Sequence, residues 1–156
     1  MYDWRSFERQ FPLLANSLKE VKRAGRLAHS YLIVSSNADL RMDFPILLAM
    51  FATCEFPLPD GAPCGICDNC RTLENRIYPD LFVLAPTSKS RQITVGLDET
   101  DPDTLRSFEY QFYLSSSNVL GLKVGIIYDC DAMNESAQNA FLKTLEEPPP
   151  NSLILM

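Results

Sequence analysis

The sequence lacks any run of about 20 apolar residues, the length that a membrane-spanning helix needs. Its start, Met1 to Arg5, has no positively charged segment followed by an apolar one, so it shows no export signal. We therefore expect a cytoplasmic protein with no role in a membrane. In that reducing compartment, the five cysteines are expected to be metal ligands or free thiols rather than disulfides.

Positive charge is also scarce. The chain has 14 Lys and Arg against 20 Asp and Glu, a formal net charge of −6. Proteins that hold nucleic acid by its phosphates usually carry a basic excess, so this balance disfavours direct DNA binding and favours protein partners. The densest basic cluster is expected to be the solvated face of a helix; its members are Lys19, Lys22, Arg23 and Arg26.

Hydrophobic residues make up 46% of the 156 positions, which is enough for one packed domain. Four apolar runs predict buried strands at residues 31–34, 80–84, 123–128 and 152–156. Helix signals predict one helix with Pro12 in its first turn and Gly25 at its end, and a second over residues 46–51 with Pro45 in its first turn. They also predict a short helix over residues 71–76 and two helices capped by Asp101 and Asn134. Strands that alternate with helices indicate an α/β fold, a parallel sheet with flanking helices.

Four of the cysteines are clustered, with nine, two and two residues between Cys54, Cys64, Cys67 and Cys70. Four thiolates form the closed tetrahedral shell that is typical of structural zinc, and such a shell leaves no open position for a catalytic water. The alternative is a redox pair, but two overlapping Cys-x-x-Cys units share Cys67, which favours a metal. Cys130 is expected to be a buried free thiol.

Residues 35–42 lie between a predicted strand and a predicted helix, where nucleotide-binding proteins place a glycine-rich phosphate loop. Ser35 and Leu40 stand where that pattern needs glycines, Arg41 stands where it needs lysine, and Met42 replaces the magnesium-binding hydroxyl. The third strand ends in Tyr128-Asp129 rather than the two carboxylates that hold magnesium and activate water. We therefore expect neither ATP binding nor catalysis.

Three segments, in this order, resemble bacterial DNA polymerase III clamp-loader subunits. Residues 29–32, His-Ser-Tyr-Leu, are similar to the family's His-Ala-Tyr-Leu. Residues 64–71, with Cys54 upstream, resemble its zinc module. Residues 139–149 are similar to Asn-Ala-Leu-Leu-Lys-Thr-Leu-Glu-Glu-Pro-Pro, with Phe141 in place of a leucine.

The resemblance implies a P-loop NTPase-like (AAA+) domain over residues 1–156 that carries an inserted zinc module at about residues 54–71. It also implies that this domain is incomplete at Met156, with lid and collar domains beyond it. The degenerate loop and the lone Asp129 resemble the delta-prime subunit rather than the gamma/tau ATPases. In the family, delta-prime also donates an arginine to a neighbour's ATP site, from a motif that would lie after Met156.

The implied function is that of a non-catalytic stator. Together with gamma/tau and delta subunits, it would help to load the sliding clamp onto primed DNA, with structural Zn²⁺ as its cofactor. Three alternatives stay open: a gamma/tau-like ATPase, a zinc-dependent nucleic-acid-binding module, and an ATPase relic with a regulatory role. Residues 139–147 are expected to be largely structural, the alternative being an interface role for Lys143, Glu146 or Glu147.

Overall fold

The computed structural model describes residues 3–87, 89–114 and 121–156. The chain divides into two compact units. Unit 1 comprises Met1–Ala28 and Ile33–Pro79, and unit 2 comprises His29–Leu32 and Asp80–Met156. No helix in the described ranges is long and apolar enough to cross a membrane.

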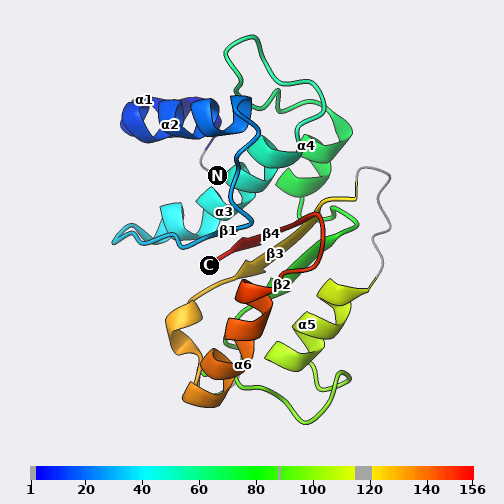
Figure 1. Cartoon of the computed structure of the whole chain (residues 1–156). Helices are drawn as coiled ribbons and strands as arrows, with labels where there is room; N and C mark the ends of the chain where they lie inside the picture. The colour runs from blue at the N-terminus through cyan, green and yellow to red at the C-terminus, as the bar shows by residue number, and fades with distance from the viewer. Residues whose placement is uncertain (1–2, 88, 115–120) are drawn as a thin grey trace. The chain divides into compact units, whose positions relative to one another are not determined.

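Unit 2 is built on a parallel sheet of β1 (Ser30–Tyr31), β2 (Leu81–Leu84), β3 (Lys123–Ile127) and β4 (Ser152–Leu155). The strands lie in the order β1-β4-β3-β2 (Figure 1). Every residue of the two central strands, β3 and β4, is buried. Central strands of a parallel sheet are covered on both faces, which explains why most of their residues are apolar. The predicted α/β fold with a parallel sheet is confirmed.

Two helices supply the rest of the unit 2 core, α5 (Leu105–Tyr113) and α6 (Glu135–Glu146), while the short 3₁₀ helix η1 (Cys130–Ala132) follows β3. Asn134 caps α6 as predicted, because its side chain accepts a hydrogen bond from the amide of Ala137 at 2.9 Å. The core cluster contains Leu84, Ile93, Leu105, Phe108, Phe112, Ile127, Met133, Ala137, Phe141 and Ile154.

Unit 1 is helical, with α1 (Trp4–Gln10), α2 (Pro12–Arg23), α3 (Ala38–Thr53) and α4 (Asp68–Glu74). Its core contains an aromatic group in which the Trp4 and Phe51 rings stack at 4.7 Å. Gly25 ends α2 as predicted: it adopts φ +65°, and Arg26 donates its amide to the carbonyl of Val21 at 2.9 Å. The sequence analysis did not predict α1.

Two of the predicted boundaries around α3 are wrong. The strand expected over residues 31–34 ends at Tyr31, and Val34 is 86% exposed. The helix expected over residues 46–51 begins at Ala38, because the Asn37 side chain caps it by accepting from the amide of Leu40 at 3.1 Å. Pro45 therefore lies inside α3, where its missing N–H removes one helical hydrogen bond.

Two other helices begin away from their predicted positions. The helix expected from Asp101 begins at Leu105, since Asp103 adopts φ +57° and Thr104 provides the cap. The helix expected from Arg71 begins at Asp68, directly after Cys67. The left-handed Asp103 separates the predicted start from the observed start of α5, while an extended Cys67 precedes the first residue of α4.

Gly125 in β3 allows α5 to approach the sheet closely. A Cβ atom at this position would lie 2.8 Å from Phe108 Cζ and 3.1 Å from Phe112 Cε2. We expect Gly125→Ala to lower the free energy of unfolding by about 1–3 kcal/mol, because the aromatic rings must leave their packed positions. Urea unfolding checks this, and Phe108→Leu added to Gly125→Ala should recover part of the loss. An unchanged unfolding free energy in Gly125→Ala would contradict the close packing.

Candidate metal centre

The structure brings the four clustered cysteines together in unit 1. The Sγ atoms of Cys54, Cys64, Cys67 and Cys70 all lie within 4.8 Å of one another. Thiolates placed tetrahedrally around zinc at about 2.3 Å are about 3.8 Å apart, so only a small contraction would complete the shell. The donor set is therefore suited to hold a metal ion, while ligation itself stays a prediction.

Two helix ends position these thiols. Cys54 ends α3, where its amide bonds to the Met50 carbonyl at 2.9 Å. Cys67 precedes α4 and Cys70 lies in its first turn, so the two cysteines share one helix face. Gly65 adopts φ +73° between Cys64 and Cys67, a left-handed conformation that glycine adopts without steric cost.

Backbone amides already point at the sulfur atoms. Cys64 donates its amide to Cys54 Sγ at 3.3 Å, while Cys67 and Ile66 donate to Cys64 Sγ at 3.3 and 3.5 Å. Hydrogen bonds of this kind favour a thiolate, and the Ile66 amide is the main cause that lowers the pKa of Cys64 to about 7. Cys64 is thus prepared to act as a ligand near neutral pH.

The more buried thiols behave differently. Burial raises the pKa of Cys54 and also that of Cys70, whose side chain is fully buried. These groups lose their protons only when a nearby cation compensates the negative charge in a poorly solvated place. Proton release and metal binding are therefore coupled at this cluster.

Asn69 links the two helices that carry the cysteines. Its Nδ2 donates to the carbonyl of Thr53 at 2.9 Å, and Asn69 is itself buried. The Thr53 carbonyl lies in the last turn of α3, where carbonyls have no helical partner. The sequence analysis missed this role, and the place of Asn69 between Cys67 and Cys70 was the only signal for it.

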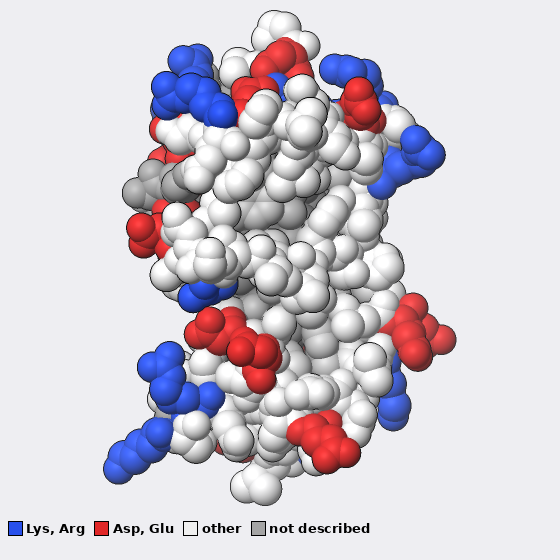
Figure 2. All heavy atoms as spheres, turned by 90° about the vertical axis from the view of Figure 1, so that its left-hand side faces the viewer, with Lys and Arg blue, Asp and Glu red and all other residues white. Residues whose placement is uncertain are grey.

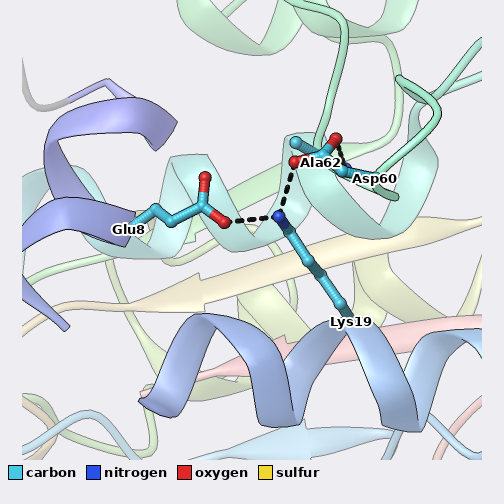
Figure 3. Close-up of polar contacts among 4 residues, drawn as sticks. All are labelled: Glu8, Lys19, Asp60 and Ala62. Atoms are coloured by element: carbon cyan, nitrogen blue, oxygen red, sulfur yellow. Dashed lines mark hydrogen bonds and ion pairs between the residues drawn. The ribbon is translucent and has the colours of Figure 1, made fainter. Parts of the chain in front are cut away.

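Lys19 anchors the loop that precedes Cys64 (Figure 3). Its Nζ donates to Glu8 Oε1 at 2.5 Å and to Asp60 Oδ2 at 2.7 Å, while Asp60 also accepts from the amide of Ala62 at 3.2 Å. Lys19 is only 7% exposed. The prediction of a solvated basic face is therefore wrong for Lys19, whereas Arg23 and Arg26 are exposed as expected.

The charges of this group reinforce one another. Burial opposes the positive charge of Lys19, but the hydrogen bonds that Lys19 donates to Asp60 and Glu8 outweigh this effect and raise the pKa of Lys19. The hydrogen bond from Lys19 is in turn the main cause that lowers the pKa of Asp60. The loop between Cys54 and Cys64 is thus tied to α2 by an ion pair that requires an ionised Asp60.

The degenerate phosphate loop satisfies its polar groups internally. The Leu40 amide at the start of α3 is bonded to the Asn37 side chain, and Arg41 Nη1 donates to the Ser35 carbonyl at 2.6 Å. Asn37 also donates its own amide to Ser35 Oγ at 3.1 Å. Met42 is 46% exposed. The absence of nucleotide binding stays a prediction.

The position that would carry the acidic pair lies at the end of β3. Tyr128 is buried, while Asp129 and Asp131 are exposed, as expected for a solvated loop. Asp129 adopts φ +48°. Cys130 is only partly buried rather than buried as predicted, and this partial burial raises the pKa of its thiol.

Two of the segments with family resemblance meet within unit 2. The His29 ring donates to the Leu145 carbonyl at 3.2 Å, and Tyr113 Oη donates to the Glu147 carbonyl at 3.0 Å, so both side chains cap the end of α6. Phe141 is buried, which supports the structural role that was expected of residues 139–147. Lys143, Glu146 and Glu147 are exposed, so the interface alternative also stays open.

The fold and the cysteine cluster together define an α/β protein with a candidate metal-binding module. The family model described as "DNA polymerase III, delta subunit" matches residues 11–156, and the chain therefore belongs to this family. This finding agrees with the resemblance that the three sequence segments carry.

Curated relatives include both delta' and tau subunits. DNA polymerase III subunit delta' of Pseudomonas aeruginosa is 32% identical over 83% of this chain and 37% of the relative. The delta' subunit of Bacillus subtilis is 31% identical over 95% of the chain and 40% of the relative. DNA polymerase III subunit tau of Escherichia coli is 31% identical over 92% of the chain and 20% of the relative. The chain therefore spans at most two fifths of the length of these three proteins.

A solved structure shares the fold. The DNA polymerase III gamma subunit-related protein of Thermotoga maritima superposes with a TM-score of 0.53 at 22% sequence identity. The similarity covers 88% of this chain and 38% of that protein. At this identity, the comparison supports the architecture of the chain and not its activity.

Removing one thiol tests the metal centre. We expect Cys70→Ser to lower the zinc content of the purified chain from about one ion to well below one, because a four-thiolate shell loses a ligand. The matched control is Cys130→Ser, which lies outside the cluster and should keep the wild-type zinc content. Zinc measured by atomic emission on both variants decides the matter. Equal zinc in the two variants would contradict the predicted ligand set.

A second test concerns the Lys19 ion pair. We expect Lys19→Met to lower the free energy of unfolding at pH 7 by about 1–2 kcal/mol, because the variant loses the ion pair with Asp60. The loss stays small because solvent screens the half-exposed Asp60 carboxylate. The pKa of Asp60 is lowered in the folded chain, so this contribution is complete above its unfolded value of 3.8 and disappears as the pH falls below it. Urea unfolding of wild type and variant should therefore converge toward pH 3. The control Arg23→Met should behave like wild type, and a difference that persists at low pH would exclude this ion pair as the cause.

Proposed function

We propose that this chain belongs to a non-catalytic, delta-prime-like subunit of the bacterial DNA polymerase III clamp loader. In this role it acts as a stator, a fixed wall of the assembly that loads the sliding clamp onto primed DNA. The observation that carries the proposal is the phosphate loop at residues 35–42, which lacks both glycines and the lysine.

The internal bonds of this loop support a subunit without its own catalysis. An active loop keeps the amides at its helix N-terminus and its cationic side chain available for phosphate. Here the Leu40 amide donates to the Asn37 side chain, and the Arg41 side chain donates to the Ser35 carbonyl. Neither group is left available for a phosphate. Asp39 lies in the first turn of α3 and adds a negative charge beside the place where phosphates would bind. After β3, Tyr128 stands in the place of the magnesium-binding carboxylate.

Protein partners follow from the same proposal. The chain would dock against gamma/tau and delta subunits, and it would act on the clamp and on primed DNA through the complex. The formal net charge of −6 agrees with partners of this kind. Figure 2 shows acidic and basic side chains interspersed on the face that it draws.

The metal in this proposal is a structural Zn²⁺ bound by Cys54, Cys64, Cys67 and Cys70. Bound zinc would supply a crosslink between the end of α3 and the start of α4, in a segment rich in proline and glycine. Four thiolates fill the tetrahedral shell, so the proposed metal has no site for a reacting water. The proposed zinc would therefore stabilise the fold of unit 1 and take no part in a reaction.

A gamma/tau-like ATPase is the second candidate. One observation favours it, namely the 31% identity to the tau subunit of Escherichia coli. The residues at Ser35, Leu40, Arg41 and Met42 argue against it, because phosphate binding in that class depends on those positions. Nucleotide binding separates the two candidates.

The deciding experiment is a titration of the purified chain with a fluorescent ATP analogue and magnesium. We expect no saturable binding up to millimolar analogue, because the loop offers neither free amides nor a lysine. The Escherichia coli tau subunit, titrated in parallel, provides a comparison from the second candidate class. Zinc should be measured on the same sample to show that the chain is intact. Saturable micromolar binding by this chain would overturn the proposal and support the ATPase.

A further inference from the structure

Lys22 reaches from α2 to the end of the helix that carries Cys54. Its Nζ donates to the carbonyl of Phe51 and lies 4.5 Å from the centroid of the Phe51 ring. Phe51 belongs to the last turn of α3, whose carbonyls lack helical partners, and Cys54 follows three residues later as the helix C-cap. A cation at this end also interacts favourably with the helix dipole.

The same ammonium group lies in the electrostatic field of the cysteine cluster. Burial lowers the pKa of Lys22, while the negative charges that Cys54 and Cys70 carry as thiolates act in the opposite direction and favour its ammonium form. Four thiolates around one divalent cation leave a net charge of about −2, which is costly in a place as buried as that of Cys70. Backbone amides offset part of this charge, and a nearby cation would offset more.

The other cations of α2 are not placed to compensate the negative charge of the cysteine cluster. Lys19 is bound between Glu8 and Asp60, and Arg23 is exposed in the last turn of the helix. Lys22 is half-buried, and its contacts with Phe51 fix its ammonium group at the end of α3. The predicted solvated basic face is therefore wrong for Lys22 as well.

We propose that Lys22 is a positioning residue of the metal centre, which fixes the end of α3 that carries Cys54 and compensates the negative charge of the thiolate shell. This inference rests on the proposed binding of metal by the four cysteines. It makes α2, which lies more than 30 residues before Cys54 in the sequence, part of the metal centre. A lysine that only capped α3 would stabilise the metal-free and metal-bound chains equally, whereas a counter-charge strengthens metal binding.

The test compares the zinc affinity of the wild-type chain with that of three variants, measured by competition with a chromophoric chelator in reducing buffer. We expect Lys22→Gln, which keeps a hydrogen-bond donor but loses the charge, to weaken zinc binding about 10-fold to 100-fold. Lys22→Arg keeps the charge and should retain most of the affinity. The matched control Arg23→Met removes a neighbouring charge from α2 and should bind zinc like wild type.

Thermal unfolding with and without zinc supplies the second readout. We expect zinc to raise the unfolding temperature of Lys22→Gln less than that of wild type. Wild-type zinc affinity in Lys22→Gln, or an equal effect of the variant on the zinc-bound and zinc-free chains, would overturn the inference and leave the metal centre intact. A wild-type chain that binds no zinc would overturn both the metal centre and the role of Lys22.

Discussion

Unit 1 depends on how the polar groups at the end of α3 are satisfied. A helix end leaves carbonyls without partners, and this end is buried among other elements. Asn69 of α4 bonds to the Thr53 carbonyl, Lys22 of α2 bonds to the Phe51 carbonyl, and Cys54 continues from the same turn toward the other thiols. Three helices therefore converge on one turn, and the cysteine cluster forms where they meet.

The same principle explains why the degenerate phosphate loop is stable without a ligand. In a nucleotide-binding protein, phosphate oxygens satisfy the amides at the start of the helix. In this chain, the Asn37 side chain satisfies the Leu40 amide and the Ser35 carbonyl holds Arg41. A loop with its polar groups satisfied in this way needs no nucleotide to keep its conformation. The proposed stator role agrees with these internal hydrogen bonds, because a fixed wall has no step that requires nucleotide binding and release.

The sequence predicted the centre of the sheet well and its edge poorly. β3 and β4 are covered on both faces, so every position is apolar or tightly constrained and the pattern is unambiguous. β1 contributes only Ser30 and Tyr31, and Leu32 and Val34 after it are exposed. The cap at Asn134 was predicted, whereas the caps at Asn37 and Thr104 were missed because Pro45 and Asp101 offered competing start signals nearby.

The four cysteines and the loss of the phosphate-loop pattern were determined by the sequence alone, because spacing and residue type carry that chemistry directly. The roles of Lys19, Lys22 and Asn69 were decided only by the tertiary structure. Lys19 and Asp60 are 41 residues apart, and Lys22 and Phe51 are 29 apart, so no local pattern connects them. From the sequence alone, a lysine in an amphipathic helix is predicted to be solvated. Only the fold shows that carboxylates or a helix end lie within reach of its ammonium group.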